Sequence, residues 1–320
     1  MFATLKISAL ANAIPGGIAQ GLIWGVMALG LFLTFKVLGF SDLSVDGSLA
    51  TGGAVCVMML QNNMSPVLSI VMAFIVGGLA GLMTGLLHTL LGIPDILSGI
   101  LTQISLYSIN LNIMGKSNQA INLRAVELYI TSNTQLLNRT ILILLVICLM
   151  IIALIYWYLG TETGCAIRAT GANQVMAKAQ GINTNKMKVI CLVLSNGFVA
   201  ASGAILSQYQ GYADVNMGRG AIVIGLAAII IGEVIGDVVM SKTPKLWKKA
   251  PFFGTLLFVI VGAIIYYLVY VFVLWLKFPA DDMKLLTAIV VAIFLAIPYL
   301  RGQSKSSFSR LAKLNKKRGN

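Results

Sequence analysis

Residues 47–94 read GSLATGGAVCVMMLQNNMSPVLSIVMAFIVGGLAGLMTGLLHTLLGIP, a run of 48 residues without Asp, Glu, Lys or Arg. A bilayer core about 30 Å thick is crossed by about 20 apolar residues in a helix. This run is therefore long enough for two membrane-spanning helices. The polar residues Gln61, Asn62 and Asn63, followed by Pro66, mark the expected turn between them.

The rest of the chain repeats this pattern. Further runs without these four residue types cover 7–35, 96–115, 140–161, 189–213, 220–232, 250–276 and 285–300, which gives nine apolar segments in all. One of them, about 221–240, is short and contains acids. Only 10% of the 320 residues are charged, against roughly 25% in soluble domains. Because lipid leaves backbone polar groups without partners, the segments are expected to be helices. The sequence predicts an all-α polytopic transmembrane bundle of about 8–10 spans over residues 1–300.

The net charge of +13 is unevenly distributed. Fifteen of the 23 basic residues lie in 160–188, in 242–249 and in the tail 301–320, whereas the alternate loops hold six. The positive-inside rule places the first set in the cytoplasm. We therefore predict a cytoplasmic loop at 160–188 and a basic cytoplasmic tail at 301–320 that touches anionic lipid. This distribution does not favour nucleic-acid binding. The side of the amino terminus depends on whether every segment is a complete span.

Catalytic and metal-binding patterns are missing from the sequence. The four cysteines are dispersed without C-x-x-C spacing, and the single histidine, His88, has no nearby ligand partner. No nucleophile–base pair or complete phosphate-binding loop is recognisable. We therefore expect no metal, no cofactor and no enzyme activity, and we expect ATP hydrolysis on a separate subunit.

Small residues recur every four positions in two segments. One trio is Gly17, Gly21 and Gly25, and the other is Gly77, Gly81 and Gly85. On a helix each trio lies on one face and allows a neighbouring backbone to approach closely. We expect tight helix packing along both faces.

A weak internal repeat links two distant segments. Residues 39–45, GFSDLSV, match residues 211–217, GYADVNM, at an offset of 172. Five apolar segments separate Asp42 from Asp214, and this odd number would orient the copies toward opposite sides of the membrane. Inverted repeats around broken helices are typical of transport pathways. The alternative is that two turns converged on a similar sequence.

Acidic and polar residues near these segments are the candidate substrate-pathway or gating positions. Intramembrane carboxylates face a bundle interior or water rather than lipid. Asp42 and Asp46 would share a helix face, or flank exposed backbone in an unwound stretch; helix capping is the plainer alternative. Glu233 and Asp237 are also four residues apart, and Lys242 or Lys245 is their expected ionic partner. The candidates are Asp42, Ser44, Asp46, Asp214, Asn216 and Glu233.

Residues 160–183, GTETGCAIRATGANQVMAKAQGIN, carry a family resemblance. They resemble the cytoplasmic loop by which permease subunits of ABC importers contact their ATPase, in the family that includes branched-chain amino acid and ribose permeases. Residues 194–204, 208–218 and 223–233 are also similar to that family, so the resemblance covers about 14–300. The ATPase-coupling residues that it implies are Glu162, Gly164, Arg168, Gly171, Asn173, Met176, Lys178 and Gly181.

The resemblance is strongest to importers of small solutes, some of them linked to aromatic amino acids. It departs at Asp42–Gly47, DLSVDG, where branched-chain permeases usually show an Asn-Phe-Ala-His-Gly type of sequence. This difference argues against branched-chain specificity.

The composition of the loop fits a docking role on its own. Ala, Met, Gln and Lys between Ala172 and Ala179 favour a short helix, with Gly171 and Gly181 at its ends. Such a helix can seat in a groove on a soluble partner, and Arg168 and Lys178 can make charged hydrogen bonds there. The alternative is an ordinary hydrated loop.

Together these features predict the translocating permease subunit of an ATP-driven importer in a bacterial cell membrane. It would carry an amino acid, sugar or nucleoside-like solute. Its expected partners are ATPase subunits, an extracytoplasmic binding protein and a second permease copy as a homodimer. The alternative is an ion-coupled secondary transporter that uses Asp42 or Asp46 as its ion site.

Overall fold

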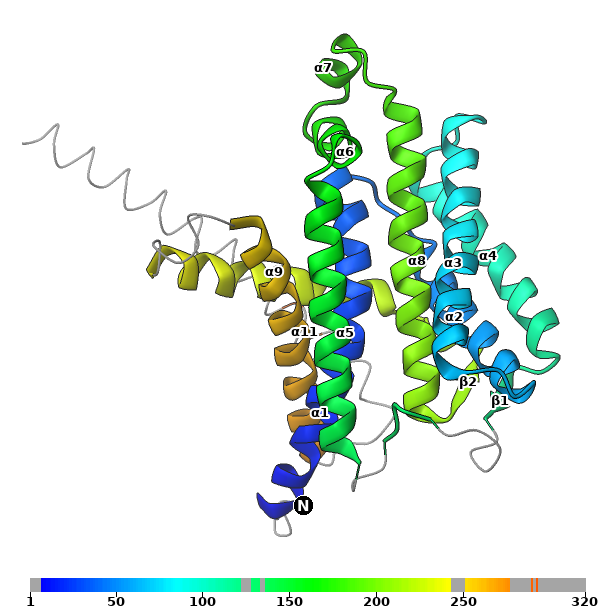
Figure 1. The fold of residues 1–320 in the computed structure, drawn as a ribbon, viewed down its shortest axis with the longest axis vertical. Coiled ribbons are helices and arrows are strands. Elements are labelled where there is room, and N and C mark those ends of the chain that lie inside the picture. The colour runs from blue at the N-terminus through cyan, green and yellow to red at the C-terminus, as the bar shows by residue number, and fades with distance from the viewer. Residues whose placement is uncertain are drawn as a thin grey trace, which may run out of the picture.

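The computed structural model describes residues 7–121, 128–132, 136–242, 251–276, 289 and 292. Helices dominate this part of the chain (Figure 1). They are α1 (Ile7–Phe32), the π-helix η1 (Leu33–Leu38), α2 (Val45–Gln61), α3 (Pro66–Thr89), α4 (Asp95–Met114), α5 (Leu137–Leu159), α6 (Glu162–Ala172), α7 (Gln174–Ala179), α8 (Thr184–Gln210), α9 (Ala221–Lys242) and α11 (Pro251–Trp275).

Seven of the described helices are long and apolar enough to cross a membrane, and α2 is a shorter apolar helix. The predicted polytopic helical bundle is confirmed. The expected turn in the long apolar run is also present, since α2 ends at Gln61 and α3 begins at Pro66. The last expected segment, 285–300, lies outside the described residues except for positions 289 and 292.

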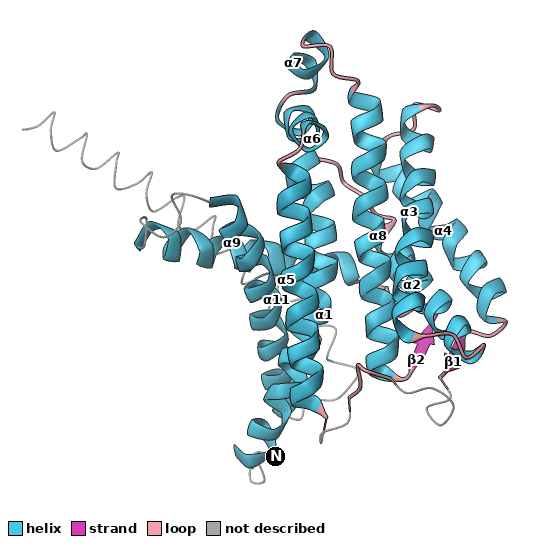
Figure 2. Cartoon of the chain, viewed as in Figure 1, coloured by secondary structure: helices cyan, strands magenta, loops and turns pink. Residues whose placement is uncertain are grey.

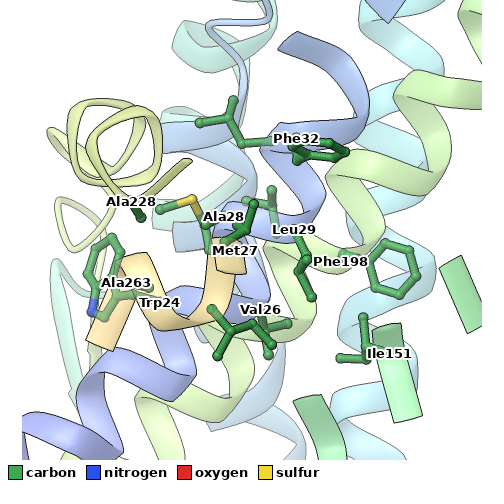
Figure 3. Packing of buried hydrophobic residues seen from close by; sticks show 14 of the residues in the cluster. Trp24, Val26, Met27, Ala28, Leu29, Phe32, Ile151, Phe198, Ala228 and Ala263 are labelled. Carbon is green, nitrogen blue, oxygen red and sulfur yellow. The ribbon is translucent and has the colours of Figure 1, made fainter. Parts of the chain in front are cut away.

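Helix α1 forms the centre of the bundle and packs against α5, α8, α9 and α11. From Gly21 to Phe32 its side chains are buried on every face, which agrees with a segment that is apolar all round. Figure 3 shows Val26, Met27 and Leu29 of α1 surrounded by residues of neighbouring helices, among them Phe198 of α8. A helix so enclosed has few positions in contact with lipid.

Both glycine trios lie at the contacts that their spacing predicts. Gly17, Gly21 and Gly25 face Val271, Ile264 and Ile260 of α11, and a Cβ atom at Gly21 would lie 2.6 Å from the Ile264 Cα. The trio Gly77, Gly81 and Gly85 faces α8, where a Cβ at Gly81 would overlap the Leu192 carbonyl. The tight packing expected from the sequence is confirmed at both faces.

Two three-residue strands were not expected from the sequence. β1 (Asn118–Ala120) and β2 (Tyr212–Asp214) pair antiparallel, with Asn118 opposite Asp214, at one end of the bundle (Figure 2). Helix α8 ends at Gly211, which has a left-handed conformation. The residues that follow, β2, then pair through their backbone with β1, the strand that follows α4. The helices α6 and α7 lie at the opposite end (Figure 1).

The two copies of the predicted repeat have the same local geometry. Gly39 and Gly211 both have positive φ, 70° and 80°, and each follows a long helical segment. In each copy the aspartate accepts a hydrogen bond from the amide two residues on: Ser44 N to Asp42 Oδ1 at 2.8 Å, and Asn216 N to Asp214 Oδ1 at 2.7 Å. Helices α1 and α8, which lead into the copies, run in opposite directions (Figure 1). The copies are therefore inverted with respect to each other.

Candidate functional site

The chain is not helical between η1 and α2, and this segment is held to α8 by a polar network. Asp42 is 3% exposed. Its Oδ1 accepts hydrogen bonds from Ser44 N (2.8 Å) and Ser44 Oγ (2.6 Å), and its Oδ2 accepts one from Asn196 Nδ2 (2.7 Å). Asn196 Oδ1 in turn accepts from Ser48 Oγ at 2.6 Å. A buried carboxylate needs such partners, so the network fixes the broken segment inside the bundle.

The shared helix face considered for Asp42 and Asp46 is wrong. Helix α2 begins at Val45, so Asp42 lies before the helix and Asp46 lies in its first turn. The hydrogen bond from Ser44 N to the Asp42 side chain takes the place of a helical backbone bond, as short polar side chains often do near helix ends. The alternative of an unwound stretch describes the segment correctly.

Asp46 joins the start of α2 to the start of α9. Its Oδ2 accepts from Gly220 N and its Oδ1 from Ile222 N, each at 3.0 Å. A carboxylate at a helix N-terminus is favoured because it satisfies free amides and interacts well with the helix dipole. Gly218 packs directly on the Asp46 backbone carbonyl, where a Cβ atom would not fit. Helices α2 and α9, which follow the two repeat copies, therefore meet at Asp46.

A polar cavity of about 290 Å³ lies beside this junction, between α2, α4 and residues 215–219. Asn110 of α4 is completely buried, and neither its amide nitrogen nor its amide oxygen has a hydrogen-bond partner. Asn216 Oδ1 is also buried without a partner. The polar residues that line the cavity are Asp46, Gln103, Tyr107, Asn110, Asn216 and Arg219.

A second cavity, of about 880 Å³, lies between α1, α9 and α11. Trp24, Tyr266, Tyr267 and Tyr270 line it, and the rings of Trp24 and Tyr267 stack with their centroids 5.8 Å apart. Arg219 lines this cavity as well as the polar one. The two cavities are therefore neighbours, one polar and one aromatic.

Glu233 pairs with a residue that the sequence argument did not consider. Its Oε1 lies 2.8 Å from Lys36 Nζ of η1, whereas the side chains of the expected partners, Lys242 and Lys245, fall outside the described residues. Glu233 and Lys36 line a third cavity, of about 250 Å³, together with Asp237. The ion pair connects α9 to the end of the α1–η1 helix.

At the end of the bundle, two glycines position α6. A Cβ at Gly164 would collide with the backbone of Tyr158 and Leu159 in α5, and one at Gly171 would collide with the Val37 carbonyl in η1. The absence of side chains at these two positions lets the α6 backbone rest directly on α5 and η1. Helix α6 is therefore in direct backbone contact with η1, which leads into the non-helical segment 39–44.

The short helix expected between Ala172 and Ala179 is present as α7, but it begins at Gln174, and Gly171 lies inside α6 instead of at its start. Helix α6 continues to Ala172, Asn173 is extended, and α7 starts at Gln174. Asn173 Oδ1 accepts from Val175 N (3.0 Å) and Met176 N (3.1 Å). Asparagine is a preferred N-cap because it satisfies such amides, and here the cap outweighs the helix propensity of its neighbours.

The other coupling candidates are distributed over both helices. Val175 and Met176 of α7 are 78% and 61% exposed. Glu162, Arg168, Asn173, Lys178 and Gly181 are also exposed, whereas Gly164 is buried and Gly171 is half-buried. The described surface thus combines apolar and charged side chains on two short helices beyond the end of the bundle.

Several residues of the site were missed from the sequence. Gln103, Tyr107 and Asn110 recur at i, i+4 and i+7, which places them on one face of an otherwise apolar helix. This stripe was a usable signal for the polar cavity. Asn196, Arg219 and Lys36 gave no such signal. Asn196 and Lys36 bind Asp42 and Glu233, which are more than 150 residues away along the chain. Arg219 is part of the site only because the fold places it on the wall of the polar cavity.

A bundle of spanning helices, in which α2 and α9 meet at the Asp46 carboxylate beside a polar cavity, defines a multi-pass membrane transport protein. Comparison with known proteins identifies the family. The family model for the permease component of branched-chain amino acid transport systems matches residues 13–297. The chain belongs to this permease family.

Relatives with described roles are permeases of several solutes. The tyrosine transport system permease protein of Clostridioides difficile (strain R20291) is 39% identical over 306 residues, covering 93% of this chain and 96% of that protein. The galactofuranose transporter permease YtfT of Escherichia coli (strain K12) is 26% identical over 275 residues, covering 85% and 75%. The ribose import permease RbsC of the same strain is 25% identical over 215 residues, covering 65% and 64%.

No solved structure matches the chain. The family membership confirms the sequence-based prediction of an importer permease subunit and does not favour the ion-coupled carrier.

Proposed function

We propose that this chain is the translocating subunit of an ATP-driven importer that works with separate ATPase subunits and an extracytoplasmic binding protein. The observation that carries this proposal is the α6–α7 surface. Val175 and Met176 are exposed there, beside the charged residues Arg168 and Lys178. Apolar side chains on a short helix are suited to a groove on a soluble partner, and the ATPase is the partner we assign to it.

Reconstituted uptake tests the proposal. In liposomes, the chain together with its ATPase and binding protein should accumulate solute when ATP is supplied inside, and a non-hydrolysable ATP analogue should abolish accumulation. The chain alone, given a proton or sodium gradient, should show none. Concentrative uptake driven by a gradient without the ATPase would contradict the proposal and restore the ion-coupled alternative.

The proposal places α6, α7 and the tail 301–320 on the cytoplasmic side of the cell membrane. Among the four cysteines, Cys165 of α6 is exposed and Cys56, Cys148 and Cys191 are buried. A membrane-impermeant maleimide should therefore label the native chain in inside-out vesicles and not in intact cells, and the Cys165→Ser variant should remove the label. Labelling of Cys165 in intact cells would reverse the assigned orientation.

For the solute we propose an amino acid with an aromatic side chain. The cavity lined by Trp24, Tyr266, Tyr267 and Tyr270 supplies aromatic surfaces on which a ring can stack. A 39% identical relative is named as a tyrosine transport permease, and this name supports the same class.

A second copy of the chain completes the proposal. Ile104 and Tyr107 of α4 are 62% and 43% exposed, and both line the polar cavity that contains Asp46 and Arg219. Charged groups that open toward lipid are costly. A homodimer that covers this face of α4 would keep the cavity away from lipid.

A further inference from the structure

Native proteins rarely leave a buried polar group without a hydrogen-bond partner. Asn110 is the clearest case in the described part of the chain. It is completely buried, both of its amide atoms lack a hydrogen-bond partner, and it lines the cavity of about 290 Å³. The unpartnered Asn216 Oδ1 is on the wall contributed by residues 215–219. Two residues that line the cavity thus carry buried amide atoms without a protein partner.

The charges on the cavity wall identify the class of occupant. Asp46 contributes a carboxylate and Arg219 a guanidinium, and the structure describes no ion pair for either of them. A solute with an ammonium and a carboxylate on one carbon matches both charges, since charge-assisted hydrogen bonds are the strongest available to it. The amides of Gln103, Asn110 and Asn216 supply neutral donors and acceptors around it. A neutral sugar would leave both charges without a counterpart.

The size of the cavity agrees with a single small head group. Ligand sites for small molecules occupy about 300–1,000 Å³, and this cavity of about 290 Å³ is at the small end of that range. Because Arg219 also lines the neighbouring aromatic cavity, a solute held by its head group has aromatic walls close by.

We infer that the cavity between α2, α4 and residues 215–219 is a solute site of the permease itself, which binds the α-ammonium and α-carboxylate of an amino acid. The ammonium interacts with Asp46, the carboxylate with Arg219, and the amide of Asn110 hydrogen-bonds between them. This inference rests on the proposed importer function. It adds that the permease itself selects among solutes after the binding protein has released them.

Asp46 gives this site a connection to the helices. Both of its oxygens accept hydrogen bonds from the first amides of α9. Since an ionised carboxylate has about four acceptor sites, a bound ammonium shares this carboxylate with the N-terminus of α9. Occupancy of the cavity therefore adds a positive charge directly at the junction between α2 and α9.

The test measures binding to the full chain in nanodiscs by the shift in its thermal unfolding. The probes are L-tyrosine, tyramine (which lacks the carboxylate) and 3-(4-hydroxyphenyl)propionate (which lacks the ammonium). L-Tyrosine should stabilise the chain at concentrations about tenfold or more below those needed for either analogue. Arg219→Gln should reduce the preference for L-tyrosine over tyramine to about twofold.

Asn110→Leu is the decisive variant, with Asn112→Leu as its matched control. Asn112 is on the same helix but is exposed. Replacing an unpartnered buried amide by an apolar group should leave the unliganded unfolding temperature unchanged or higher. The same variant should raise the half-maximal L-tyrosine concentration about tenfold or more, while Asn112→Leu behaves as the native chain.

Three results would overturn the inference. The first is that none of the twenty common amino acids stabilises the native chain. The second is equal binding of L-tyrosine and both analogues, and the third is native-like binding by Asn110→Leu; in each case this cavity is not a site for the α-ammonium and α-carboxylate of an amino acid. The importer proposal is judged separately, by ATP-dependent uptake in the assembled complex. If the Asn110→Leu variant takes up solute as the native chain does, the proposed solute site is refuted and the importer proposal stands. If the chain binds L-tyrosine but the assembled complex shows no ATP-dependent uptake, the importer proposal is refuted and the site stands.

Discussion

Gly203→Ala is expected to lower the free energy of unfolding of the bundle by about 3 kcal/mol, the upper part of the range for overpacked interiors. A Cβ atom at Gly203 of α8 would collide with the Leu49 carbonyl of α2, and one at Gly52 of α2 would collide with the Ala200 carbonyl of α8. The two backbones are therefore in direct contact at both positions. A backbone cannot move aside as a flexible side chain can, so one added methyl group must separate the helices.

The measurement is thermal or denaturant unfolding of the chain in detergent, together with the yield of monodisperse protein. Gly16→Ala is the matched control, because the nearest atom to its Cβ would be Tyr209 Oη at 3.8 Å, an ordinary contact. There the gain in helix propensity, up to about 1 kcal/mol, should leave stability equal or higher. Equal stability of the Gly203 and Gly16 variants would show that α2 and α8 are not packed as described.

The spanning helices and their closest contacts were predictable because lipid imposes a simple rule on sequence. Segments must be apolar and long enough, and glycines four residues apart mark the face where another backbone approaches. Gly77 and Gly81 illustrate this, since both lie against α8 as their spacing predicts. The sequence did not name α8 as the partner, because nothing in the spacing identifies the second helix.

The interior of the site was only partly predictable. Asp42 and Asp46 were recognisable as unusual carboxylates, but their partners, Asn196 and the amides of Gly220 and Ile222, are separated from them by 154 to 176 residues. Only the fold brings such groups together. The break at Asn173 is a different case, because the N-cap signal was present in the sequence, but the prediction gave more weight to the helix-forming residues around it.

Gly171→Val is expected to uncouple the importer. Gly171 is where the α6 backbone rests on η1, and a Cβ atom there would collide with the Val37 carbonyl and lie 2.9 Å from the Leu38 Cα. The chain runs from Leu38 through Gly39 to the buried Asp42 network and then to Asp46. If the proposed ATPase partner displaces α6, the movement would reach the junction of α2 and α9 over only a few residues. A valine at 171 would separate α6 from η1 and interrupt this connection.

The expected result is a normal level of the variant in the membrane, with solute uptake reduced about tenfold or more and ATP hydrolysis that no longer responds to the loaded binding protein. The altered contact involves only the last residues of the spanning segment Asn12–Leu38, so insertion and folding should be preserved. Ala172→Val is the control, because Ala172 is the next residue of α6 and is exposed. Uptake and ATP hydrolysis are measured side by side in the reconstituted complex. If Gly171→Val transports as the native chain does, or if Ala172→Val loses as much, the contact between α6 and η1 does not carry the coupling and the route from the ATPase to Asp46 must lie elsewhere.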